Sequence, residues 1–100
     1  MVSLHITLTI QRAHVGDFRE FEHGAARVMS KFGGTILATI ELDGETPETL
    51  REIHVVSFPS EDAYAAYRAA PDLVPMMPLR ERSVMSTKIV KGKPGPRYGE

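Results

Sequence analysis

The stretch FGGTILATIELDGE, residues 32–45, places two adjacent glycines between a helix-like segment and a strand-like one. Before it, apolar residues recur every three or four positions, which is typical of one face of a helix. These apolar residues are Val15, Phe18, Phe21, Ala25, Val28, Met29 and Phe32. We expect Gly33 to end the helix in the left-handed conformation and Gly34 to let the chain turn into a strand at residues 35–42.

At its other end, the same helix follows the clearest strand signal in the chain. Residues 2–10 alternate between apolar and polar side chains, many of them β-branched, which predicts a strand with one buried face. The apolar set is Val2, Leu4, Ile6, Leu8 and Ile10, and the polar set is Ser3, His5, Thr7 and Thr9. Between strand and helix, Asp17 is the expected N-cap, and Glu20 would complete a capping box.

The second half of the chain repeats this order. LDGETPETLRE predicts a turn and an exposed loop, and residues 51–58 predict a third strand that ends at Pro59. Ser60 is a suitable N-cap for the next helix, residues 61–70, which Pro71 ends. Three prolines in residues 71–82 exclude a long regular helix there, and a fourth strand is expected from Ser83.

The predicted order, βαββαβ, is that of the ferredoxin-like α+β fold. Two right-handed crossovers give a four-stranded antiparallel sheet in the order 4-1-3-2, with both helices on one face. We assign residues 1–91 to this domain. Residues 92–100 are rich in glycine, proline and charge, and form either a disordered tail or an arm that becomes ordered against a partner.

Composition limits the partners of this domain. One hundred residues with a net charge of −1 do not favour capture of nucleic acid or of an anionic membrane. The chain has no cysteine, so disulfides and thiolate metal sites are excluded. The alternating N-terminal segment resembles neither a signal peptide nor a membrane span, and we expect a cytoplasmic protein.

The face of the sheet without helices is expected to be covered by a second copy. In the third strand, Ile53 and Val55 lie on one side, while His54, Val56 and Phe58 lie on the other. A central strand that is apolar on both sides is usually buried on both sides. We therefore predict a homodimer in which two sheets pack face to face and enclose a cavity.

Four segments together resemble a known family: FGGTIL, VVSFPSEDAYAAYRAAP, PLRERS and IVKG. They are similar to the family of unknown function numbered 1330, in the dimeric α/β-barrel superfamily, over roughly residues 4–92. This resemblance implies a dimeric α/β barrel. In related barrels of this superfamily, cofactor-free isomerisation, cyclisation or oxygenation of small molecules takes place in the barrel cavity.

The chain also departs from that family. Ser57 stands where the family usually has a glutamate, and the family's tryptophan ahead of the third strand has no counterpart. Arg80 is retained at a position where the family has an arginine that faces the cavity. The resemblance thus implies the fold more directly than it implies an activity.

His5 is the candidate catalytic residue, because an imidazole on the cavity-lining face can transfer protons near neutral pH. The alternative is that His5 only makes a structural hydrogen bond. Candidate ligand-binding residues are Thr7, His54, Ser57 and Arg80. The alternation does not decide which face His54 takes, and Arg80 could instead form a surface salt bridge.

The remaining candidates favour structural roles. Tyr64 and Tyr67 are expected on the inner face of the second helix, as core residues whose hydroxyls lie at the edge of the core. Met76 and Met77 could form a flexible lid, although methionine more often fills a core. No histidine pair has the i, i+4 spacing of a helical metal site, so neither metal nor cofactor is predicted.

Two functions remain open from the sequence. The first is a cofactor-free isomerase, cyclase or monooxygenase that acts on a small organic molecule in the barrel cavity. The second is a non-catalytic module that binds a small ligand or a partner. The sequence does not decide whether the protein is an enzyme.

Overall fold

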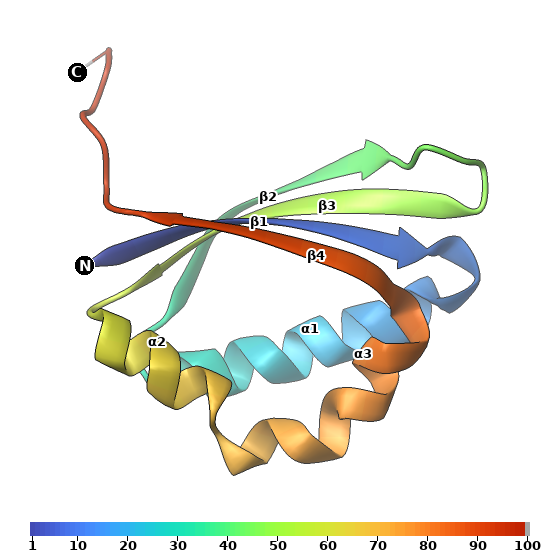
Figure 1. Cartoon of the computed structure of the whole chain (residues 1–100), viewed down its shortest axis with the longest axis horizontal. Helices are drawn as coiled ribbons and strands as arrows, with labels where there is room; N and C mark the ends of the chain where they lie inside the picture. The colour runs from blue at the N-terminus through green and yellow to red at the C-terminus, as the bar shows by residue number, and fades with distance from the viewer. Residues whose placement is uncertain (100) are drawn as a thin grey trace.

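A computed structural model describes residues 1–99 of the chain. Its elements run in the order β1 (Val2–Gln11), η1 (Arg12–His14), α1 (Val15–Ser30), β2 (Thr35–Asp43), β3 (Thr49–Phe58), α2 (Glu61–Arg68), η2 (Pro71–Met76), α3 (Met77–Ser83) and β4 (Val84–Gly92). Figure 1 shows two layers, a twisted sheet and a layer of helices on one of its faces. The proline-rich segment forms a 3₁₀ helix and the short α3, in agreement with the exclusion of a long helix.

The strands form one antiparallel sheet in the order β2-β3-β1-β4. This order confirms the predicted ferredoxin-like topology. The two long central strands pair from Val2 with Phe58 to Gln11 with Thr49. Because paired residues on antiparallel strands point to the same face, this register decides which side chains of β3 share a face with those of β1.

The glycine pair ends α1 as predicted, and a different structural constraint requires glycine at each of the two positions. Gly33 has a positive φ of 76°, and its N–H donates to the carbonyl of Ser30, while the N–H of Gly34 donates to the carbonyl of Met29. These are the two hydrogen bonds of a Schellman motif. A Cβ on Gly34 would lie 2.4 Å from Cγ of Met29 and 2.5 Å from Cε1 of Phe58. The close approach lets β2 begin directly beneath the helix.

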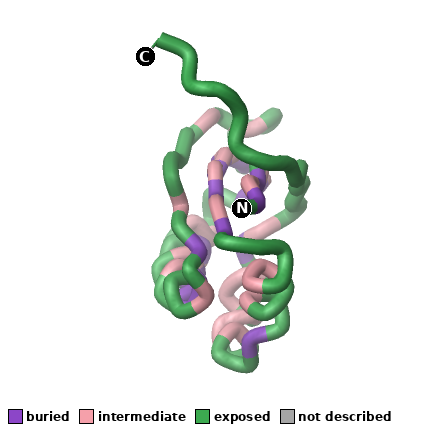
Figure 2. The backbone as a smooth tube through the Cα atoms, turned by 90° about the vertical axis from the view of Figure 1, so that its left-hand side faces the viewer, coloured by how far each residue is buried: buried purple, intermediate pink, exposed green. Residues whose placement is uncertain are grey.

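The core lies between the sheet and α1. The apolar face of β1 packs against the apolar stripe of α1, and Ile10 and Phe18 are almost completely buried. A second cluster joins the other end of β1 to Phe58, with the tyrosines of α2 packed against it. Figure 2 shows that buried positions concentrate in the middle of the molecule, while β2 and β4 stay largely exposed.

One predicted cap is present and the other is not. Oγ of Ser60 accepts a hydrogen bond from the N–H of Ala63 at 3.1 Å, which confirms the N-cap of α2. The helix α1 begins at Val15, two residues earlier than the predicted cap, and its N-cap residue is His14 without a side-chain hydrogen bond. Asp17 therefore lies in the first turn, where its carboxylate pairs with Arg82 at 3.2 Å.

The face of the sheet opposite the helices carries exposed apolar side chains. Ile40 of β2 and Val90 of β4 are each about half exposed, and the register places them on the same face as Ile53 and Val55 of β3. This face, which we call the open face, is the one for which the sequence predicts a second copy of the chain. The dimer remains a prediction.

After β4, residues 93–99 extend away from the helices as an exposed segment without helix or strand (Figure 1). β4 ends at Gly92, one residue beyond the predicted domain boundary, and Glu100 lies outside the described residues. In residues 1–99, every helix is too short or too polar to cross a bilayer.

Candidate functional site

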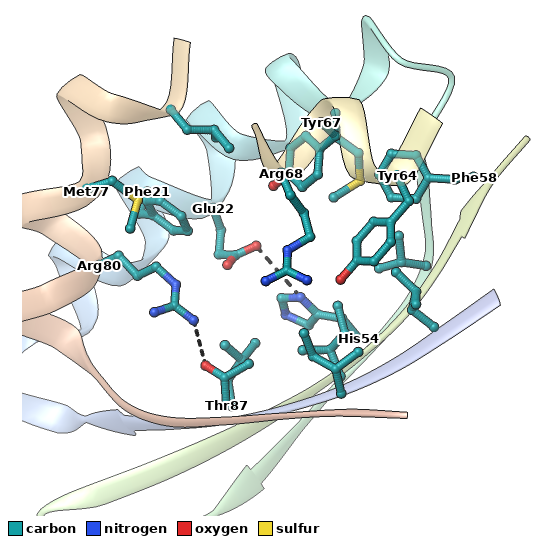
Figure 3. Close-up of a pocket in the computed structure, with 17 residues that line it drawn as sticks. Phe21, Glu22, His54, Phe58, Tyr64, Tyr67, Arg68, Met77, Arg80 and Thr87 are labelled. Atoms are coloured by element: carbon teal, nitrogen blue, oxygen red, sulfur yellow. Dashed lines mark hydrogen bonds and ion pairs between the residues drawn. The ribbon is translucent and has the colours of Figure 1, made fainter. Parts of the chain in front are cut away.

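A pocket of about 380 Å³ lies between the sheet and the helices (Figure 3). Its floor comes from β1, β3 and β4, and its walls come from α1, α2, η2 and α3. Most of the lining is apolar or aromatic, as is usual for small-molecule sites. The polar or charged lining residues, other than two tyrosines, are Glu22, His54, Arg68, Arg80 and Thr87.

His54 is the histidine of this pocket, and Glu52 orients its ring. Both residues lie on the helix-facing side of β3 and are buried. Nε2 of His54 lies 2.9 Å from Oε1 of Glu52, and Oε2 of Glu52 accepts a hydrogen bond from Arg19 at 2.8 Å. A carboxylate that already accepts from a guanidinium acts as an acceptor, so Nε2 carries the proton and donates to Glu52. In the neutral ring, Nδ1 is then left as the basic nitrogen.

Glu22 of α1 approaches that basic nitrogen. Its Oε2 lies 3.7 Å from Nδ1 of His54, and Figure 3 shows the carboxylate pointing toward the ring. Burial raises the pKa of Glu22 above its ordinary value, and the neighbouring Glu52 raises it further, while His54 and Arg80 act in the opposite direction. Glu22 can therefore hold a proton closer to neutral pH than an exposed glutamate can.

Two arginines enter the pocket from different helices. Arg80 of α3 donates from Nη2 to Oγ1 of Thr87 at 2.6 Å. Arg68, at the end of α2, lies over the ring of Tyr64, with 5.7 Å between its Cζ and the ring centroid. In Figure 3, Arg68 points into the pocket above His54, and Arg80 enters from the side of α3. Both guanidinium groups therefore face a pocket whose lining is mostly apolar or aromatic.

Tyr67 adds a neutral donor to the lining. Burial, with a smaller effect of Glu22, raises the pKa of Tyr67 to about 12. Its hydroxyl therefore stays protonated throughout the physiological pH range and can donate a hydrogen bond. The ring also packs against Phe58, with 5.5 Å between the ring centroids, so the residue combines a core role with a polar tip.

Comparison with known proteins identifies the fold and not the family. The chain matches no protein-family profile, and no curated protein is significantly similar to it in sequence. Solved structures do resemble it. A protein of unknown function from Rhodopseudomonas palustris superposes with a TM-score of 0.78 at 14% identity, covering 96% of this chain and 84% of that one.

Two other similar structures are of proteins described by an activity. A putative antibiotic biosynthesis monooxygenase from Deinococcus radiodurans has a TM-score of 0.70 at 19% identity, covering 100% of this chain and 98% of that one. A cofactor-independent oxygenase from Streptomyces nogalater has a TM-score of 0.67 at 12% identity, covering 99% of this chain and 98% of that one. This chain shares their ferredoxin-like fold.

The structure separates the residues that the sequence grouped into one site. His54 and Arg80 line the pocket between sheet and helices. His5 and Thr7 pair with Val55 and Ile53 on the open face, and Ser57 lies on that face as well. This pocket lies on the opposite face of the sheet from the dimer cavity that the sequence predicts, and that cavity remains a prediction. Catalytic and ligand-binding roles for the residues of the open face remain predictions.

Three charged residues in or beside the pocket, Glu22, Glu52 and Arg68, were not selected from the sequence, although the first two carried a signal. Glu22 falls four residues after Phe18 and three before Ala25, inside the apolar stripe of α1. Glu52 has the same parity along β3 as Val56 and Phe58, which places it on a buried face. A carboxylate inside an apolar pattern is unusual and often marks a functional group. Arg68 had no such signal, because it lies at an exposed helix end.

Two methionines of the proline-rich segment have different neighbours. Met77 lines the pocket. Met76 packs against α1 so closely that a Cβ on Gly24 would lie 2.2 Å from its Sδ. Met76 thus fills the interface between η2 and α1, as the structural alternative predicted. A lid role for Met77 remains a prediction.

Proposed function

We propose that this protein is a cofactor-free enzyme that transfers a proton on a small organic molecule bound between the sheet and the helices. The observation that carries the proposal is the Glu52–His54 pair, which directs the basic Nδ1 of His54 into a pocket of about 380 Å³. A general base needs a reachable proton and an orienting partner, and this arrangement supplies the partner. The site resembles nucleophile-activating dyads in form but contains no serine or cysteine nucleophile among the residues that line the pocket.

The chemistry follows from the charges around the ring. Nδ1 of His54 takes a proton from an acidic C–H of the substrate, and the imidazolium that forms is stabilised by Glu52 on its other nitrogen. The electron pair moves to an adjacent carbonyl oxygen, where the guanidinium of Arg80 stabilises the enolate. Return of the proton to a different carbon completes an isomerisation. Attack of the carbanion on a second carbonyl of the same molecule forms the new C–C bond, and the resulting alkoxide takes the proton back from the imidazolium of His54 to complete a cyclisation.

The proposal also includes oxygenation, with molecular oxygen as the co-substrate. The solved structures that support it include a cofactor-independent oxygenase and a putative antibiotic biosynthesis monooxygenase. At sequence identities of 12% and 19%, these structures establish a shared fold, and the reaction has to be tested by experiment. Membership of the family of unknown function numbered 1330, a homodimer formed through the open face and a cytoplasmic location belong to the same proposal.

The test uses phenylpyruvate, which has a carboxylate, an aromatic body and an acidic benzylic C–H. We expect the protein to accelerate its keto–enol tautomerisation, followed by ultraviolet absorbance, and His54→Gln to reduce the rate by about 10²–10⁴-fold. The control is His14→Gln, since His14 lies at the start of α1 outside the pocket.

Two outcomes would overturn the proposal. If His54→Gln leaves the rate unchanged while His5→Gln abolishes it, the reaction takes place on the open face. If phenylpyruvate binds, as judged by ligand-observed NMR, and the wild-type protein does not accelerate its tautomerisation or exchange of its benzylic protons, the non-catalytic binding module is the better description.

A further inference from the structure

The two arginines of the pocket form ion pairs with no carboxylate in residues 1–99. By contrast, Arg19 and Arg82 each pair with an acid. Of the acids nearby, Glu52 is bound by Arg19 and His54, and Glu22 lies beside the other nitrogen of His54. The lining of the pocket therefore holds two guanidinium groups without an ion pair in the described part of the chain, against the single carboxylate of Glu22.

Packing holds each guanidinium in place without neutralising it. Thr87 accepts a single hydrogen bond from Arg80, which leaves the other donors of this guanidinium free for a ligand. Tyr64 supports Arg68 through a cation–π contact between residues four apart on α2. A planar guanidinium stacked on a ring keeps its edge available for bidentate binding of an acidic group.

The apolar and aromatic part of the lining determines what shape of ligand skeleton the pocket can accept. The aromatic rings of Phe21, Phe58 and Tyr67 and the apolar side chains of β1 surround the same volume. Such a lining suits a flat, apolar skeleton, and only its acidic groups would meet the guanidinium groups. Glu22 is the carboxylate of the same lining, where two arginines outnumber it, and burial raises its pKa.

We propose that the pocket takes a flat, largely apolar molecule with two acidic groups, one held by Arg68 and one by Arg80, in the space that His54 also lines. This inference rests on the proposed function for the role of His54, but its test does not, because binding is measured without turnover. Arg68 is then a specificity-determining residue that selects dianions over monoanions. Arg80 holds the other acidic group.

The probes are 2-naphthoate and the 1,4-, 2,3- and 2,6-isomers of naphthalenedicarboxylate, measured by titration calorimetry on the full chain. They share one skeleton and differ in the number and spacing of carboxylates. We expect at least one dicarboxylate to bind about tenfold or more tightly than 2-naphthoate, as a second charge-assisted contact allows. Arg68→Gln should remove this advantage and change the affinity for 2-naphthoate less than about twofold.

The matched control is Arg27→Gln, which removes the same charge from an exposed position of α1 outside the pocket. It should leave the preference for the dicarboxylate intact. The inference is overturned if no dicarboxylate binds more tightly than 2-naphthoate, if none of the probes binds, or if Arg68→Gln weakens all probes equally. A dianion preference that depends on Arg68, in a protein that shows no turnover, would retain this inference and refute the proposed enzyme.

Discussion

His54 and Glu52 lie two residues apart on β3, point to the same face, and are joined by a 2.9 Å contact between Nε2 and Oε1. Arg19 reaches across from α1 to the other oxygen of Glu52 at 2.8 Å. The ring is thereby held between strand and helix, with one nitrogen committed to Glu52 and the other facing the pocket. This relationship converts an ordinary strand histidine into a candidate base.

The first prediction concerns the tautomer of His54. In the wild-type protein, the neutral ring should carry its proton on Nε2, which ¹⁵N NMR of the imidazole can detect. Glu52→Gln should give a mixture of tautomers, because an amide can donate as well as accept, and should reduce turnover by about 10²-fold. Glu41→Gln is the control, since Glu41 binds the other side of Arg19. An unchanged tautomer in Glu52→Gln would contradict the orienting role.

The second prediction concerns the pH dependence of stability. Burial raises the pKa of Glu22 above 4.5, so the folded state binds this proton more tightly than the unfolded chain does. The stability linked to this proton is fully present below pH 4.5 and is lost as pH rises through the raised pKa. Glu22→Gln should therefore gain in free energy of unfolding relative to wild type as pH rises, measured by urea unfolding between about pH 4 and 8. A difference that is constant across this range would contradict it.

The third prediction concerns the turn after α1. Gly34→Ala should destabilise the protein by about 1–3 kcal/mol, because the new Cβ would overlap Met29 and Phe58. Gly16→Ala, near the start of α1, meets nothing within 4 Å and should be neutral or stabilising. Thermal unfolding of both variants checks the prediction. Equal melting temperatures for Gly34→Ala and wild type would show that the chain does not need a close approach there.

The fourth prediction concerns the open face. Light scattering should give twice the chain mass of 11.1 kDa for the wild type. Ile40→Lys should shift the protein toward the monomer, because a charge on this apolar face opposes sheet-to-sheet packing. Val74→Lys changes an exposed apolar residue of η2, away from that face, and should leave the mass unchanged. A monomeric wild-type protein would remove the dimer from the proposal.

Local patterns in the sequence determined the order and nature of the elements. These patterns are the alternation in residues 2–10, the apolar stripe after Val15 and the glycine pair. Each involves only residues that are near one another in the sequence, so it predicts an element without knowledge of the fold. Asp17 was wrong as a cap because His14 and the preceding 3₁₀ turn already begin the helix. Residues near a helix start often compete for that position.

The sequence by itself left the face of His54 undecided, and the tertiary structure decided it. Alternation along β3 gave apolar residues on both faces, so it could not orient His54. Pairing of Ile6 with His54 across the sheet places the ring on the helix side. Glu22 and Arg80, far apart along the chain, then meet it only through the packing of α1 and α3. A charged site depends on distances between elements, which no local pattern encodes, whereas the strands and helices that carry it follow from hydrophobic periodicity.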